Sequence, residues 1–153
     1  MHRIELKVPP PIYALGLALL MWAVSLAPPH LEMRMWIRVG AVLVFGGLAV
    51  ITMVAALVVL LRARTTIDPH APDRAKVLVT AGIYARTRNP MYLSMLLALM
   101  AFAGWLANPF TVLLALAFIP LITRVQILPE ERALTVRFGQ PYRAYCARVK
   151  RWV

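Results

Sequence analysis

Cysteine and histidine are almost missing from this chain of 153 residues. Cys146 is the only cysteine, so an internal disulfide is excluded. The three histidines are His2, His30 and His70, and neither their spacing nor their distance from Cys146 resembles a metal-ligand pattern. The sequence therefore predicts neither a disulfide framework nor a metal centre.

Acidic residues are also scarce, with 6 Asp and Glu against 17 Lys and Arg, which gives a formal net charge of +11. Such an excess is typical of partners that are nucleic acids or anionic membranes. However, residues 39–61 and 89–123 contain no charged side chain at all. A membrane span needs roughly 20 apolar residues, and a soluble nucleic-acid-binding protein has no use for runs of this length. The sequence predicts an integral membrane protein that contacts membrane lipids and no nucleic acid.

The hydrophobic segments predict an all-α, polytopic membrane protein whose residues 1–153 form a single domain. Although the first segment lies near the N-terminus, it ends in Ala-Pro-Pro-His rather than in a signal-cleavage pattern, so we interpret it as a span. Asn108-Pro109 predicts a tight hairpin, and Gly46-Gly47 predicts close contact between helices. The four expected spans are 11–27, 36–61, 91–107 and 110–127.

The distribution of arginine and lysine predicts the orientation. Basic residues are concentrated in the 62–88 loop and in the tail from 124, whereas the 28–35 loop has only Arg34. The positive-inside rule then places both termini, the 62–88 loop and the tail in the cytoplasm. Residues 65–76 are expected to form a loop. The tail is expected to begin as an amphipathic helix with Leu134, Phe138 and Val136 on its apolar side. Gly139 and Pro141 are expected to stop this helix.

A polar stretch, Gly-Ile-Tyr-Ala-Arg-Thr-Arg-Asn-Pro-Met-Tyr, fills residues 82–92 immediately before the third apolar segment. Asn89 followed by Pro90 predicts a helix start in which the asparagine side chain accepts from a first-turn amide. With Arg88 beside it, this helix start would form an anion site, and Tyr84 and Tyr92 would flank a planar ring. The alternative is an ordinary membrane boundary with a cap, inside-positive charges and interfacial aromatics.

A second unusual feature is the adjacent pair Glu130 and Glu131, which follows the fourth apolar segment. Carboxylates bind sugar hydroxyls or an ammonium group. The alternative is that Pro129 starts a helix and that the acids favour its first turn. Together, the anion-binding and cation-binding groups match S-adenosylmethionine, which has a carboxylate, an amine, a ribose and an adenine.

These segments resemble the family of isoprenylcysteine carboxyl methyltransferases and phospholipid N-methyltransferases. The resemblance covers residues 64–152 and is carried by Leu-Val-Thr-Ala-Gly-Ile-Tyr-Ala-Arg-Thr-Arg-Asn-Pro-Met-Tyr-Leu-Ser at 78–94, by Pro-Glu-Glu-Arg-Ala-Leu-Thr-Val-Arg-Phe-Gly-Gln-Pro-Tyr-Arg-Ala-Tyr at 129–145, and by Arg-Val-Lys-Arg-Trp at 148–152. It implies a cytosol-facing S-adenosylmethionine site, with Arg88 and Glu131 as candidate catalytic residues. The cofactor-binding residues that it implies are Thr80, Gly82, Tyr84, Arg88, Asn89, Pro90, Tyr92, Glu130 and Glu131.

The implied reaction is transfer of a methyl group to a lipophilic acceptor that enters from the bilayer: an isoprenylcysteine-like carboxylate, a phospholipid amine or a small thiol. A carboxylate or a thiolate would need no general base, whereas an amine would lose its proton, with Glu130 or Glu131 as the candidate bases. Two other hypotheses remain: an NADPH-dependent membrane reductase of the sterol-reductase type, and a non-enzymatic membrane adaptor.

Overall fold

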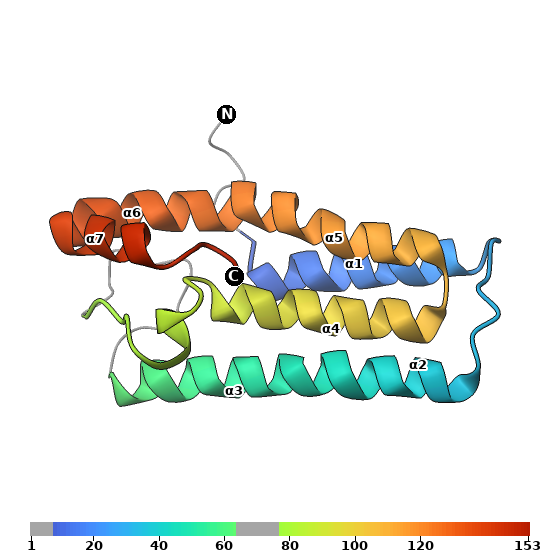
Figure 1. Ribbon diagram of the computed structural model, residues 1–153. Helices are drawn as coiled ribbons and strands as arrows, with labels where there is room; N and C mark the ends of the chain where they lie inside the picture. Colours follow the sequence, from blue (N-terminus) through green and yellow to red (C-terminus); the bar gives the residue numbers. More distant parts are fainter. Residues whose placement is uncertain (1–7, 64–76) are drawn as a thin grey trace.

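The computed structural model describes residues 8–63 and 77–153, and all regular structure in these two ranges is helical (Figure 1). This confirms the predicted all-α class. The predicted loop at 65–76, with Arg64 beside it, lies outside the described residues. The elements are α1 (Pro10–Ser25), α2 (Met35–Ala41), η1 (Val42–Gly46), α3 (Gly47–Arg62), η3 (Gly82–Ala85), α4 (Pro90–Leu106), α5 (Pro109–Ile122), η4 (Thr123–Ile127), α6 (Leu128–Phe138) and α7 (Gln140–Arg148).

Two helices are longer than their individual elements indicate. The π turn η1 joins α2 to α3 in one helix of 28 residues, Met35–Arg62. The π turn η4 joins α5 to α6 in one helix of 30 residues, Pro109–Phe138. The helix thus continues beyond residue 127, where the predicted fourth span ends, and the end of that span stays a prediction. Pro129 follows the π turn instead of opening a separate helix, and a wider turn accommodates the lost N–H and the ring of a proline within a helix.

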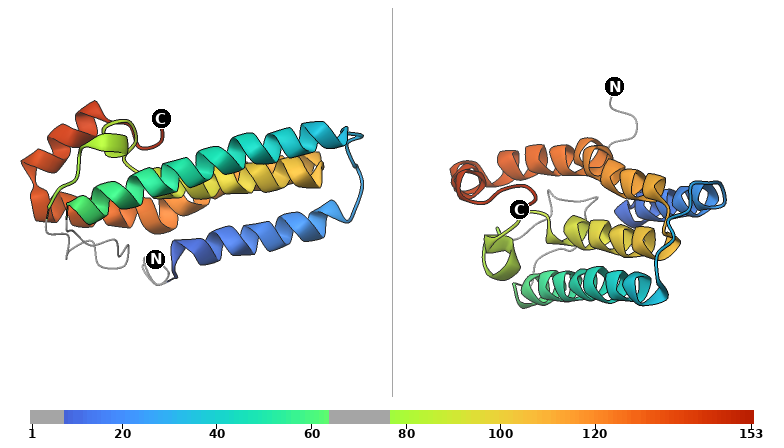
Figure 2. Two further views of the ribbon diagram at one scale, coloured as in Figure 1. Left: turned by 90° about the horizontal axis from the view of Figure 1, so that it is seen from below. Right: turned by 45° about the vertical axis from the view of Figure 1, so that its right-hand side comes forward.

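The helix α4 is the centre of the bundle, since it packs on α1, α2, α3 and α5 (Figures 1 and 2). The helix α1 packs on α4 and α5. The predicted hairpin at 108–109 is confirmed. Ala107 adopts the left-handed conformation at the end of α4, and the Asn108 side chain accepts from the amide of Phe110 at 3.0 Å, which caps α5.

Small residues set the spacing of the long helices. A Cβ on Gly104 would lie 2.7 Å from the Cβ of Ala41, so only glycine permits this approach of α4 to α2. The prediction of close contact at Gly46 and Gly47 is half correct: a Cβ on Gly46 would lie 4.0 Å from the Cβ of Ala101, whereas a Cβ on Gly47 would meet nothing within 4 Å. One glycine of an adjacent pair points away because successive residues on a helix lie about 100° apart.

The two long helices are long and apolar enough to cross a membrane, whereas α1 and α4, although apolar, have 16 and 17 residues. Many large apolar side chains on α1, α2, η1 and α3 are exposed, among them Leu15, Leu43 and Ile51 at 60%, 69% and 66%. Exposed apolar faces of this extent are typical of contact with lipid. The structure thus supports a membrane location, and the count of four spans stays a prediction.

The C-terminal segment folds back onto the bundle at the end where α6, α7 and η3 meet (Figure 1). Gly139, with φ +56°, ends α6 as predicted. The predicted stop of this helix at Gly139 and Pro141 is confirmed, but the sequence did not predict the second helix, α7, which begins at Gln140 and has a proline in its first turn. Leu134 and Phe138 pack against a cluster of Tyr142, Tyr145 and Val149, whereas Val136 is 87% exposed and does not belong to the apolar side.

Candidate functional site

The segment before α4 lies tightly against α3. Gly82 has φ +61°, and a Cβ there would lie 2.7 Å from Cγ2 of Val59, so a side chain at this position is excluded on two grounds. Thr80 precedes it in an irregular, half-buried stretch. After the short helix η3, the carbonyl of Tyr84 accepts from the hydroxyl of Tyr145 at 2.7 Å. This bond joins the first predicted motif to α7.

Pro90 begins α4 and is buried, as predicted. The predicted capping role of Asn89 is wrong. Asn89 occupies the N-cap position, but its side chain donates from Nδ2 to the carbonyl of Arg151 at 2.9 Å and makes no cap bond. The backbone N–H of Asn89 donates to Oγ1 of Thr87 at 3.2 Å. The physical reason is competition: the C-terminal segment brings a carbonyl acceptor to the asparagine amide.

The last residues of the chain lie across the polar stretch. The amide of Arg88 donates to the carbonyl of Lys150 at 3.0 Å, and the hydroxyl of Thr87 donates to the carbonyl of Arg151 at 3.3 Å. Thr87 is only 2% exposed. The residues just before α4 therefore bind peptide carbonyls of the C-terminal segment, and the predicted anion site stays a prediction.

Glu131 lies between two arginines. Its Oε1 is 3.2 Å from Nη1 of Arg88. The carboxylate also accepts two hydrogen bonds from Arg151, at 2.9 Å from Nε and at 2.7 Å from Nη2. The forked contact is the strong form of an arginine–carboxylate pair, and it raises the pKa of Arg151 above its ordinary value. Exposure of the side chains is 13% for Arg88, 17% for Glu131 and 34% for Arg151, so the pair of Arg88 with Glu131 is largely shielded from water.

The guanidinium of Arg88 contacts a second element. Its Nη1 also donates a hydrogen bond to the thiol sulfur of Cys146 at 2.6 Å. Its Nε is buried and has no hydrogen-bond partner among the described residues. A buried, unpaired donor on a cation costs free energy, so this nitrogen marks a place where an anionic or polar ligand would compensate the loss.

Glu130 faces a different neighbour from Glu131. Its Oε1 accepts a hydrogen bond from the hydroxyl of Tyr92, which is 6% exposed, so α6 is joined to the first turn of α4. Adjacent residues on a helix point about 100° apart, which explains how the two glutamates serve separate partners.

Three tyrosines beside these pairs stay protonated at neutral pH. Burial raises the pKa of Tyr145 to about 12, although the positive charge of Arg88 opposes the shift. Burial also raises the pKa of Tyr84 and of Tyr142 above the ordinary value. Their hydroxyls are therefore available as hydrogen-bond donors, as Tyr145 shows with the carbonyl of Tyr84.

The structure brings most of the predicted site residues together. Arg88, just before α4, contacts Glu131 on α6, and Tyr92 on α4 contacts Glu130 on α6. Asn89 and Tyr84 are bonded to the C-terminal segment and to α7. Gly82 and Pro90 shape the backbone, and Thr80 lies upstream. The sequence prediction missed Thr87, Cys146 and Arg151. Arg151 belongs to the quoted Arg-Val-Lys-Arg-Trp motif, which was the available signal for its role.

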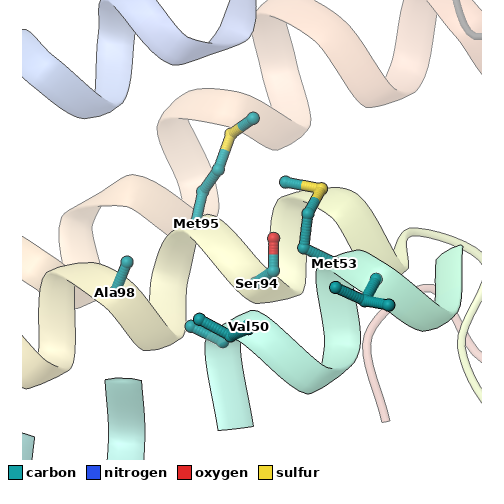
Figure 3. Close-up of a pocket in the computed structure, with 7 residues that line it drawn as sticks. Val50, Met53, Ser94, Met95 and Ala98 are labelled. Atoms are coloured by element: carbon teal, nitrogen blue, oxygen red, sulfur yellow. The ribbon is translucent and has the colours of Figure 1, made fainter. Parts of the chain in front are cut away.

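A separate pocket of about 290 Å³ lies between α3 and α4 (Figure 3). Tyr92 and Ser94 are two residues apart on α4 and point to nearly opposite sides, so the pocket does not include the glutamate pair. In Figure 3, Met53 and Met95 project into the space above the two helices. The lining of this pocket is almost entirely apolar: Ala49, Val50, Met53, Val54, Ser94, Met95 and Ala98.

Long apolar helices with a charged cluster at one end are typical of a membrane protein. The family model for phospholipid methyltransferases matches residues 36–141, which is more than half of the chain. The chain therefore belongs to the phospholipid methyltransferase family, and this membership suggests a membrane methyltransferase. An uncharacterised protein of Haemophilus influenzae is 44% identical over 63 residues, which cover 41% of this chain and 100% of that protein. No solved structure gives a significant match.

Proposed function

We propose that the protein is an S-adenosylmethionine-dependent methyltransferase for a lipophilic acceptor, with its site at the cytoplasmic membrane face. The observation that supports this most is the contact of Arg88 with Glu131, beside the contact of Tyr92 with Glu130. These four residues come from the two segments that carry the resemblance to membrane methyltransferases.

The donor set fits the cofactor chemically. The partnerless Nε of Arg88 suits the carboxylate of the methionine part, since arginine recognises carboxylates in a forked geometry. The carboxyl oxygens of Glu130 and Glu131 suit an ammonium group or ribose hydroxyls, because such oxygens accept hydrogen bonds, as Oε1 of Glu130 does from Tyr92. Tyr84 and Tyr92 add aromatic surface for a planar ring.

Bound S-adenosylmethionine supplies a methyl group on a sulfonium, which passes to a lone pair of the acceptor while the electrons of the broken S–C bond stay on sulfur. The chain itself binds and orients. Orientation of two reactants accounts for roughly 7–11 kcal/mol of barrier lowering, and Arg88 and Glu131 are placed for this role because Arg151 and Cys146 hold them. The C-terminal segment covers the residues before α4 and excludes water there.

The acceptor enters from the bilayer, because apolar helix surface leads up to the site. It is a carboxylate of the isoprenylcysteine type, a phospholipid amine or a small thiol. The cofactor proposal is tested by titrating the detergent-purified protein with S-adenosylmethionine and, separately, with NADPH, and recording heat. We expect saturable binding of S-adenosylmethionine and none of NADPH. Binding of NADPH alone, or of neither, contradicts the proposal.

The proposed orientation places both termini in the cytoplasm and rests on the arginines that follow α5 and precede α4. Since the thiol of Cys146 accepts a hydrogen bond from Arg88, a probe at an exposed position is preferable: Ala144→Cys in a Cys146→Ser background. We expect an impermeant maleimide to label this thiol in inverted vesicles and not in intact cells. The Cys146→Ser protein without the added cysteine is the control. Labelling in intact cells would contradict the proposed orientation.

A further inference from the structure

The C-terminal segment, residues 149–153, is held on the candidate site by its backbone. In Figure 1 it runs back from α7 toward the first turn of α4. Its peptide carbonyls accept hydrogen bonds from the N–H of Arg88 and from the side chain of Asn89, at 3.0 and 2.9 Å. Trp152 packs against the central apolar cluster of the bundle. None of these contacts needs the side chain of Arg151.

The side chain of Arg151 makes a different kind of contact, because it places a cation on the carboxylate of Glu131. Its Nε donates to Oε1 and its Nη2 to Oε2, while Nη1 of Arg88 lies 3.2 Å from Oε1. The side chain of Arg151 is 34% exposed, compared with 13% for Arg88. Arg151 is therefore the partner of Glu131 that lies closer to water, where an ion pair is weakened by the solvent.

The guanidinium of Arg151 resembles the group that the proposed function assigns to Glu131. An ammonium group and a guanidinium are both cations that donate several hydrogen bonds and accept none. A carboxylate has about four lone-pair positions on its two oxygens, and the contacts of Arg151 take two of them and that of Arg88 one. A ligand ammonium therefore gains full contact with Glu131 only when the forked contact of Arg151 opens.

We propose that Arg151 is an intramolecular competitor of the cofactor: its guanidinium occupies Glu131 in the free protein, and the ammonium group of S-adenosylmethionine displaces it. The inference rests on the proposed function, because that function supplies the ligand. The exchange replaces one cation by another, so Glu131 keeps its positive partners in both states and no buried charge is left unpaired. The backbone of the C-terminal segment stays bound, and Arg151 holds the carboxylate in place until the cofactor arrives.

The alternative is that Arg151 is a permanent anchor of the C-terminal segment. The two hypotheses predict opposite results. Removal of a competitor tightens cofactor binding, whereas removal of an anchor loosens the segment that covers the residues before α4 and weakens binding. The affinity of Arg151 variants for the cofactor therefore decides between them.

Arg151→Gln removes the competing charge, and we expect it to bind S-adenosylmethionine about threefold to tenfold more tightly than the wild type, as the loss of a partly exposed ion pair allows. Arg151→Lys keeps the charge but loses the forked geometry, so we expect an affinity between the two. The control for net charge is Arg148→Gln, at an exposed position on α7. We expect this control to bind within about twofold of the wild type. Isothermal titration of the detergent-purified full chains gives the affinities.

A chemical measurement on the wild type follows the displaced side chain directly. Phenylglyoxal modifies accessible guanidinium groups, and peptide mass spectrometry gives the rate at Arg151 relative to that at Arg143, which is exposed on α7. We expect saturating S-adenosylmethionine to raise this relative rate by about threefold, because the guanidinium leaves its ion pair for water. An unchanged or lower rate indicates a permanent anchor and overturns the proposal.

The pattern of affinities separates this inference from the proposed function. Absence of S-adenosylmethionine binding in every protein, Arg151→Gln included, contradicts the proposed function and overturns the inference with it. Binding that is no tighter in Arg151→Gln than in Arg148→Gln overturns only the inference. Binding by Arg151→Gln together with none by the wild type supports both. If Arg151→Gln does not fold, the affinity of Arg151→Lys and the modification rate of the wild type decide.

Discussion

Arg88→Lys is expected to lower the affinity for S-adenosylmethionine by about tenfold to a hundredfold, while the protein still inserts and folds. The positive charge survives, so orientation in the membrane is preserved. What is lost is geometry, because one ammonium nitrogen cannot contact Glu131 and Cys146 and also offer the separate buried Nε. Hydrogen bonds to charged groups contribute about 1.5–3 kcal/mol each, which sets the expected size.

Arg86→Lys is the matched control, since Arg86 is exposed and lies two residues away on the same segment. Isothermal titration of both purified variants with S-adenosylmethionine measures the difference. If Arg88→Lys binds as tightly as Arg86→Lys, the polar stretch is an ordinary membrane boundary and the site assignment fails.

Glu131→Gln is expected to weaken both cofactor binding and the folded state. Its carboxylate contacts both Arg88 and Arg151. An amide in its place leaves two positively charged guanidinium groups close to each other without the negative charge that they share. With about 1.5–3 kcal/mol for a charged hydrogen bond, we expect the unfolding temperature in detergent to fall by roughly 5–10 °C. The C-terminal segment, which Arg151 anchors, should become more sensitive to protease.

Glu32→Gln removes the same charge at an exposed position between α1 and α2 and serves as the control. Thermal unfolding and limited proteolysis of the two variants give the comparison. An unfolding temperature and a protease pattern equal to those of Glu32→Gln would show that Glu131 does not hold the C-terminal segment.

Local signals made much of the fold predictable. Uncharged runs gave the long helices, Asn108-Pro109 gave the hairpin, and Gly139 gave the end of α6, because each depends on residues next to one another. The continuity of the helix through Pro120 and Pro129 was not predictable in this way. Proline usually ends a helix, and the π turn that accommodates Pro129 has no sequence signature of its own.

In the candidate site, too, features set by neighbouring residues were predictable and contacts between distant residues were harder to predict. Arg88 and Glu131 were predicted as members of one site, and they are in contact. The role of Asn89 was wrong because helix-capping rules consider only the following amides, whereas its actual acceptor is the carbonyl of Arg151, 62 residues away in the chain. Partners separated by so much sequence are set by tertiary packing.

The central position of α4 also has a consequence for how the bundle is assembled during synthesis. The helix α1 leaves the ribosome first, yet it packs on α4 and α5, which are made after α2 and α3. The first helix therefore reaches its packing partners only after two later helices have been made, and a nascent chain halted after Arg62 would lack every residue of the glutamate and arginine cluster. Maturation of the polar site is thus a late step, completed only when the tail that carries Arg151 has emerged and bound Glu131.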